Sequence, residues 1–200
     1  MKVVGILGSP RPDGNTATLL CHVLEGAAAQ GATTTTIAAY RLAVRACTNC
    51  DACKRTGKCA INDDMQEIYQ RISESDVVIF ASPNYMGGIS GHLKPVIDRL
   101  YRYFTVTGTG ELATTIFPSK KAALLITQNS PGDNRYYVEA FTPLRGILHL
   151  VFQGSFDPVH ESLLVPLLLA PAMQGKNSVT ENPKLLQEAY AFGAGLVREK

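Results

Sequence analysis

The chain has 200 residues, of which 46% are hydrophobic and 18% charged, and this balance fits a single globular α/β domain with a well-buried core. The formal net charge is only +2 and no basic run stands out, so nucleic acid is not expected as a partner. The longest apolar run, Leu163 to Met173, contains two prolines and is too short to span a bilayer, and no secretory signal precedes the first predicted strand. We therefore expect no membrane partner and a cytoplasmic location, where cysteines remain reduced.

The first half of the chain alternates between strand and helix patterns. Val3 to Leu7 is a nearly continuous apolar run, which is typical of a parallel strand covered on both faces. Thr16 to Gln30 is predicted to be helical because its apolar residues recur on one face. Thr33 to Tyr40 indicates a second strand near a sheet edge. A helix over about Met65–Ser75 and a third strand, Asp76 to Ala81, follow a cysteine-rich segment.

The second half continues this alternation up to its middle and is then harder to interpret. We predict a helix over 91–104, a linker over 105–118, a strand over 122–127, a helix over 134–151 bent at Pro143, a short fifth strand over 152–156 and a helix over 183–199. Polar loops follow the first, third and fourth strands, and this pattern predicts a doubly wound parallel sheet with its ligand beyond the carboxyl ends of the strands. We expect one domain over 1–200, with an insertion at 47–59 and a C-terminal extension over 155–200.

The loop after the first strand carries many hydrogen-bond donors. Ser9, Arg11, Asn15 and Thr16 bring hydroxyl, guanidinium and amide groups to the point where the first helix begins. The start of a helix offers free N–H groups and the positive end of its dipole, so a phosphate fits there. The loop matches neither GxxxxGK[ST] nor GxGxxG, which argues against a nucleoside triphosphate or a dinucleotide. An ordinary strand-to-helix turn without a ligand is the alternative.

A second loop, Pro83 to Arg99, reads PNYMGGISGHLKPVIDR and has the form PxYxG, a polar turn and LKxxIDR. Together with the first loop, it resembles the flavodoxin-like NAD(P)H-dependent FMN reductases and the iron–sulfur flavoproteins. The resemblance covers residues 1–130 well and the rest loosely. It implies a flavodoxin-like, doubly wound, five-stranded parallel sheet with helices on both faces.

This resemblance also implies a flavin site built from three loops. The FMN phosphate would be held by Ser9, Arg11, Asn15 and Thr16, and Ala17 would also belong to the cofactor site. The flavin ring would be lined by Ser82, Pro83, Asn84, Tyr85, Met86 and Gly87. The third loop, Thr127 to Ser130, would approach the other side of the ring, chiefly with Thr127 and Asn129. Packing within the core or the loop is the alternative role for Tyr85 and Met86. The flavin would carry the chemistry, so no side chain is expected to act as a catalytic acid or base. Homodimers or homotetramers are expected by the same resemblance.

Four of the five cysteines, Cys47, Cys50, Cys53 and Cys59, are clustered as C-x2-C-x2-C-x5-C. This compact spacing suits a four-iron four-sulfur cluster better than a structural zinc ion, whose ligands usually form two pairs separated by a longer loop. The spacing closely resembles that of archaeal and bacterial iron–sulfur flavoproteins, where it binds such a cluster near FMN. Free or redox-active thiols are the alternative, since Cys50 and Cys53 also form a C-x-x-C pair.

Three functions follow from these patterns. The first is a flavoprotein that transfers electrons through FMN and a four-iron four-sulfur cluster, with a redox carrier or NAD(P)H as its electron donor. The second is a cluster-free NAD(P)H-dependent FMN or quinone reductase. The third, from a different class, is a non-catalytic sensor that uses flavin or thiols.

Overall fold

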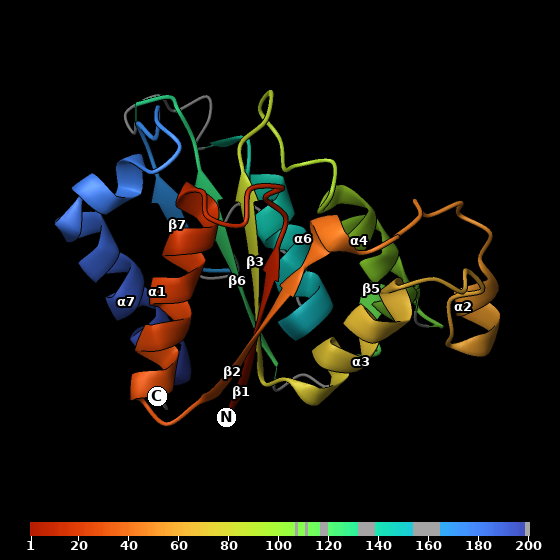
Figure 1. Ribbon diagram of the computed structural model, residues 1–200. Helices are drawn as coiled ribbons and strands as arrows, with labels where there is room; N and C mark the ends of the chain where they lie inside the picture. Colours follow the sequence, from red (N-terminus) through yellow and green to blue (C-terminus); the bar gives the residue numbers. More distant parts are fainter. Residues whose placement is uncertain (107, 111, 117–119, 132–138, 154–164, 199–200) are drawn as a thin grey trace.

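The computed structural model describes residues 1–106, 108–110, 112–116, 120–131, 139–153 and 165–198 (Figure 1). Its centre is a five-stranded sheet in the order β2-β1-β3-β6-β7, and all four strand pairings are parallel. The strands are β1 (Lys2–Leu7), β2 (Thr33–Ala38), β3 (Val77–Pro83), β6 (Lys121–Thr127) and β7 (Leu167–Ala170). The chain order reverses between β1 and β3, as in flavodoxin-like sheets, so a ligand-binding crevice is expected there. The predicted flavodoxin-like fold and the edge position of the second strand are confirmed.

Helices cover both faces of this sheet, as predicted. On one face lie α1 (Asn15–Ala29) and α7 (Pro183–Val197), and on the other lie α3 (Met65–Glu74), α4 (Lys94–Arg99) and α6 (Thr142–Gln153) (Figure 1). Each face has its own apolar core because successive strand residues point to opposite sides: Val78 and Phe80 join one core, while Val77 and Ile79 join the other. Within the described residues, no helix is both long and apolar enough to cross a membrane.

The two helices on the first face pack with their backbones in close approach. A Cβ atom added at Gly26 of α1 would lie 1.9 Å from the carbonyl oxygen of Tyr190, and one added at Gly193 of α7 would lie 1.8 Å from the carbonyl oxygen of Val23. Only glycine fits such positions, because the atoms in the way belong to the facing backbone. This close contact holds the C-terminal helix against α1.

The predicted fifth strand over 152–156 is wrong. Phe152 and Gln153 are the last residues of α6, and 154–156 lie outside the described residues. The fifth strand is β7, which pairs with β6 from Leu124↔Leu167 to Thr127↔Ala170. β7 has only four residues inside a longer apolar run, so no alternation distinguished it in the sequence. Pairing with β6 is what makes this stretch a strand.

The predictions for 91–118 were also partly wrong. The expected helix over 91–104 is shorter: α4 ends at Arg99 and a 3₁₀ turn, η2 (Leu100–Tyr103), follows it. The expected linker contains an antiparallel hairpin of β4 (Phe104–Val106) and β5 (Leu112–Thr114). In the later helix, α6 begins at Thr142, and residues 134–138 of the predicted range lie outside the described residues. Short elements of this kind depend on contacts with the rest of the fold more than on local periodicity.

Candidate functional site

A cavity of about 280 Å³ lies beyond the carboxyl ends of β1, β3, β6 and β7. The loops that follow these strands come together at the upper end of the sheet in Figure 1. The cavity is lined by Ser9, Arg11, Gly14, Asn15, Thr16, Pro83, Asn84, Tyr85, Thr127, Gln128, Asn129, Met173, Gln174, Gly175 and Lys176. Its position at the switch point of the sheet is where open α/β folds bind their ligands.

The first wall of the cavity is the loop from Gly8 to the start of α1. Gly8 donates from its N–H to the carbonyl oxygen of Ala81 at 2.7 Å, and an added Cβ there would lie 2.6 Å from the Cβ of Leu93. This close approach requires glycine and sets the direction of the loop. The N-cap of α1 is Gly14, which forms no side-chain capping bond. The first-turn N–H groups of α1 therefore remain available to an anion.

Two threonines join this loop to the end of β6. The hydroxyl oxygens of Thr16 and Thr127 share a hydrogen bond of 2.8 Å, and both residues are buried. The next loop is tied to the same strand, since Asn84 N donates to the carbonyl oxygen of Thr127 at 2.7 Å. The Asn84 side chain also donates to Oε1 of Gln128 at 3.2 Å. The loops after β1, β3 and β6 are thus linked to one another by polar contacts.

The loop after β3 ends in a tight turn over residues 85–88. Tyr85 and Gly88 exchange backbone hydrogen bonds of 2.8 and 3.0 Å, and the two residues between them, Met86 and Gly87, have positive φ angles of 53° and 81°. Positive φ at both central positions is the signature of a type I′ turn. Asn84 supports the turn by accepting from Gly87 N through Oδ1 at 3.0 Å. Tyr85 is half exposed, and the Met86 side chain is fully exposed at the tip.

The fourth wall, the loop after β7, was missed by the sequence analysis. It contributes Met173, Gln174, Gly175 and Lys176 to the cavity. Gln128, which lies within the predicted loop from Thr127 to Ser130, lines the cavity as well. Asn15 holds this wall in place, because its amide donates to the carbonyl oxygen of Gly175 at 2.7 Å. The rule that ligands bind beyond the carboxyl ends of parallel strands would have indicated this loop if β7 had been predicted.

The structure brings most of the predicted flavin-site residues into one cavity. Those that line it are Ser9, Arg11, Asn15, Thr16, Pro83, Asn84, Tyr85, Thr127 and Asn129. Four predicted residues lie elsewhere. Ala17 packs against the core between α1 and the sheet, and Ser82 is fully buried, with its Oγ accepting from Ser90 N at 2.8 Å. Met86 and Gly87 form the exposed turn.

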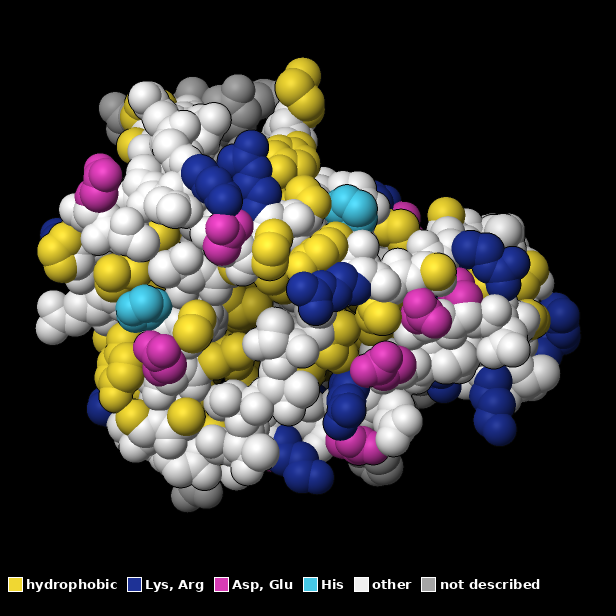
Figure 2. All heavy atoms as spheres, viewed as in Figure 1, with side chains coloured by type: hydrophobic (Ala, Val, Ile, Leu, Met, Phe, Trp, Pro, Cys, Tyr) yellow, Lys and Arg dark blue, Asp and Glu magenta, His cyan; other side chains and the backbone are white. Residues whose placement is uncertain are grey.

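The four clustered cysteines lie on a segment, residues 43–62, that we call the cysteine arm. It extends from the side of the molecule around the short helix α2 (Ala52–Thr56), and Figure 2 shows Lys and Arg side chains spread over this region. Lys54 fastens it to the body: its ammonium donates to the carbonyl oxygens of Tyr101 and Phe104 and lies 3.7 Å from the centre of the Tyr101 ring. Arg102 adds a hydrogen bond of 2.9 Å to the carbonyl oxygen of Gly57.

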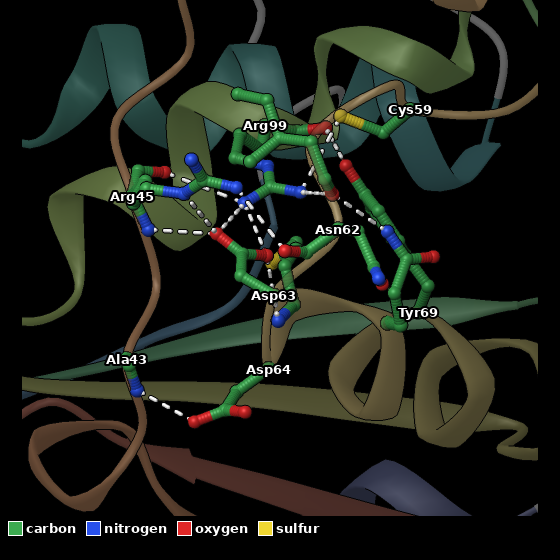
Figure 3. A network of polar contacts seen from close by, with 11 residues as sticks. Ala43, Arg45, Cys59, Asn62, Asp63, Asp64, Tyr69 and Arg99 are labelled. Carbon is green, nitrogen blue, oxygen red and sulfur yellow. Dashed lines mark hydrogen bonds and ion pairs between the residues drawn. The ribbon is translucent and has the colours of Figure 1, made fainter.

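A buried ion pair anchors the base of the arm (Figure 3). Arg99 and Asp63 lie 2.6 Å apart, and their side chains are 1% and 7% exposed. Arg99 also donates to the carbonyl oxygen of Ile61 at 3.1 Å and to Sγ of Cys59 at 3.4 Å. Burial by itself raises the pKa of Asp63, but hydrogen bonds from Arg99 and from two backbone N–H groups outweigh it and lower that pKa below its usual value. Through its bonds to Ile61 and Cys59, Arg99 therefore connects α4 directly to the cysteine arm.

The cysteines have the right chemistry for a metal cluster, but they do not form a closed site. All four are free of disulfides, Cys47 and Cys50 are exposed, and Cys53 and Cys59 are half-buried. A backbone hydrogen bond from Ala52 lowers the pKa of the Cys50 thiol, which favours the thiolate that metals bind. Among the residues that the structure describes, no three Cys, His, Asp or Glu side chains gather in a way that could hold a metal ion.

Comparison with curated proteins finds relatives for about half of the chain. It is 44% identical over 99 residues to an iron–sulfur flavoprotein of Methanocaldococcus jannaschii, a match that covers 50% of this chain and 51% of the relative. It is 39% identical over 99 residues to an iron–sulfur flavoprotein of Methanosarcina thermophila, which covers 50% of this chain and 52% of that protein. The match thus spans about half the length of each of these relatives.

Solved structures share the fold over nearly the whole chain. An NAD(P)H:quinone oxidoreductase from Methanothermobacter marburgensis superposes with a TM-score of 0.73 at 17% identity and covers 100% of this chain and 98% of that one. An FMN-dependent NADH-azoreductase from Bacillus anthracis, solved with FMN, also has a TM-score of 0.73, at 13% identity. The superposition covers 99% of this chain and 100% of the azoreductase chain. The sequence model of the NADPH-dependent FMN reductases matches residues 1–135, which is more than half of the chain. The chain therefore belongs to the NADPH-dependent FMN reductase family.

Proposed function

We propose that this protein is an FMN-dependent oxidoreductase whose flavin occupies the cavity between the loops after β1, β3, β6 and β7. The main support is the set of groups that line this cavity at the switch point of the sheet. They are the first turn of α1, which has no side-chain cap, the Ser9 hydroxyl and the Arg11 guanidinium. When bound, FMN would supply the one- and two-electron redox chemistry. Membership of the NADPH-dependent FMN reductase family supports this proposal.

The residues of the chain bind and orient the flavin. Ser9, Arg11 and the first-turn N–H groups of α1 would hold the phosphate. Pro83, Asn84 and Tyr85 would lie along the ring, with Asn84 held in place by its bonds to β6 and Gln128. The polar contacts between these loops would hold the binding residues in place before FMN binds. FMN binding would therefore require little further ordering of the loops. No side chain is assigned the role of an acid or base.

Replacing Ser9 by alanine is expected to weaken FMN binding about tenfold or more, because a hydrogen bond to a charged group contributes about 1.5–3 kcal/mol. Ser9 is only 4% exposed and its Oγ accepts from Arg11 N at 3.2 Å, so the hydroxyl is held at the cavity wall. Quenching of flavin fluorescence measures the affinity. Ser73→Ala, on the exposed side of α3, is the matched control and should bind FMN as the natural chain does. A natural chain that neither binds FMN nor oxidises NAD(P)H would contradict the proposed function.

We further propose that Cys47, Cys50, Cys53 and Cys59 bind a four-iron four-sulfur cluster that passes electrons to or from the flavin. The support is the spacing of the four thiols and the match to proteins that are named iron–sulfur flavoproteins. Because these cysteines do not gather in the described structure, the arm would have to rearrange when iron and sulfide bind. Its attachment through Lys54 and Arg99 leaves residues 47–53 mostly exposed and therefore free to do so.

Replacing Cys59 by serine is expected to abolish most of the bound iron, since a cubane cluster needs four thiolate ligands. The measurement is iron and acid-labile sulfide after anaerobic purification, with about four irons per chain expected for the natural protein. Cys21→Ser is the matched control, because Cys21 lies on α1 and is also a free, exposed thiol. Flavin without iron in the anaerobically purified natural protein would contradict the cluster.

Flavin without iron in the anaerobically purified protein would favour the second function, a cluster-free NAD(P)H-dependent FMN or quinone reductase. The exposed Cys47 and Cys50 would then be free or redox-active thiols. The electron donor would then be NAD(P)H, whereas with a cluster a one-electron redox carrier becomes the donor to test. The third function, a non-catalytic sensor, is contradicted by turnover of NAD(P)H with any acceptor.

We also propose that the protein forms a homodimer or homotetramer in a reducing cytoplasm. This proposal rests on the family to which the chain belongs. Met86, fully exposed at the tip of the turn beside the cavity, is a side chain that a subunit contact there would cover. Free thiols on an exposed arm are typical of a reducing compartment. Light scattering coupled to size exclusion measures the oligomeric state.

A further inference from the structure

Lys176 lies in the loop after β7, the wall of the cavity that the sequence motifs did not indicate. It lines the same cavity as Ser9 and Arg11, and its ammonium donates to Oδ2 of Asp13 at 2.7 Å. Figure 2 shows basic and acidic side chains side by side over the loops at this end of the molecule. The hydrogen bond from Lys176 lowers the pKa of Asp13, so this carboxylate is ionised at neutral pH.

The loop that carries Lys176 is fastened to the start of α1 from several directions. Besides its bond to Gly175, the Asn15 side chain donates to Oγ of Ser178 at 3.1 Å and accepts from Val179 N at 3.1 Å. Met173 N donates to the carbonyl oxygen of Gln128 at 2.9 Å. The bonds of Asn15 join residues about 160 positions apart and hold the backbone of Lys176 beside the first turn of α1. The bond between Met173 and Gln128 ties the same loop to the loop after β6. A lysine held this way can reach an anion bound at that turn.

The charges at the cavity suit a phosphate monoester. Arg11 and Lys176 are the charged side chains among the described lining residues, and none of those residues is acidic. Asp13 lies just outside and is attracted to both cations. A phosphate monoester carries a charge of about −1.5 to −2 near pH 7. The Lys176–Asp13 pair is about half exposed on both sides, and such pairs contribute little stability, so a dianion can displace the carboxylate.

We propose that Lys176 is a specificity residue for the flavin phosphate: Asp13 holds its ammonium at the cavity wall until the phosphate of FMN takes Asp13's place. The proposal rests on the proposed FMN site and deepens it. Lys176 would make the site prefer FMN over riboflavin, which has the same ring and no phosphate. Asp13 would limit that preference, because its carboxylate competes with the phosphate for the same ammonium.

The test compares FMN and riboflavin binding to the flavin-free full chain by fluorescence quenching. Lys176→Met is expected to weaken FMN binding about tenfold and to leave riboflavin binding unchanged within about twofold, because only FMN carries the charge. Asp13→Asn is expected to strengthen FMN binding about threefold, since the competing carboxylate is removed. The preference for FMN should fall with added salt in the natural chain and fall less steeply in Lys176→Met.

Lys184→Met is the matched control, because Lys184 lies on α7, is 87% exposed and is paired with Glu188 outside the cavity. It should bind both flavins as the natural chain does. Equal losses of FMN and riboflavin in Lys176→Met would overturn the proposal, because they would mean that Lys176 only supports the loop. Weaker FMN binding in Asp13→Asn would overturn the exchange between carboxylate and phosphate. A natural chain that binds neither flavin would instead overturn the proposed function itself.

Discussion

Replacing Asp63 by asparagine is expected to lower the free energy of unfolding by about 3–5 kcal/mol, because the change leaves the buried charge of Arg99 without its counter-ion. The Arg99 side chain is 1% exposed, so water cannot solvate its guanidinium once the carboxylate is gone. Asp63 also accepts hydrogen bonds from the backbone N–H groups of Arg45 and Met65, and the neutral amide accepts these less strongly. Urea denaturation followed by circular dichroism measures the change.

Asp64→Asn is the matched control for this experiment. Asp64 is the next residue, is exposed, and accepts a single bond of 2.7 Å from Ala43 N, so a loss of about 1 kcal/mol or less is expected. If Asp63→Asn costs no more than Asp64→Asn, the buried pair does not anchor the arm.

The same pair predicts how stability depends on pH. The folded-state pKa of Asp63 is lowered, so its contribution is fully present above the unfolded value of about 3.9 and is lost as pH falls through the lowered folded value. The loss of stability on acidification should therefore be smaller in Asp63→Asn than in the natural chain. Equal pH dependence of the two proteins would contradict the assignment.

Replacing Gly193 by alanine is expected to lower the free energy of unfolding by about 3 kcal/mol, at the upper end of what overpacking costs. The added Cβ would lie 1.8 Å from the carbonyl oxygen of Val23 and 2.6 Å from its carbonyl carbon. Both atoms belong to the α1 backbone and cannot rotate away, so α7 must move outward and expose part of the core that it covers. Urea denaturation measures this change as well.

Gly195→Ala, on the same helix, is the control, and its expected change in the free energy of unfolding has the opposite sign. Among the described residues, no heavy atom lies within 4 Å of a Cβ added at Gly195. Alanine there is expected to raise stability by about 0.5–1 kcal/mol, because glycine loses more conformational freedom in a helix. If both variants change stability by the same amount, the close approach of α1 and α7 at Gly193 is contradicted.

The parts of the fold that could be predicted are those that a short stretch of neighbouring residues indicates by its own pattern. β1, β3 and β6 are continuous apolar runs, and α1 shows a helical period, so neighbouring residues alone indicated these elements. The loops after the three strands could be assigned to one site for the same reason, since parallel strands end at one edge of the sheet. Nine of the predicted flavin-site residues, from Ser9 to Asn129, line one cavity accordingly.

What remained unpredictable depends on contacts between distant parts of the chain. β7 has four apolar residues and no periodicity, and it is a strand because β6 lies beside it. The Arg99–Asp63 pair joins residues 36 positions apart, and the bonds of Asn15 to the β7 loop join residues about 160 positions apart.

The sequence by itself thus determined the sheet type, the polar loop after the first strand and the four-cysteine spacing, because each is a short pattern of residue types. The tertiary structure alone decided which loop forms the fourth wall of the cavity, how the cysteine arm is attached and where helices need glycine. Those features arise from packing and charge pairing across the fold, and no local pattern of residues encodes them.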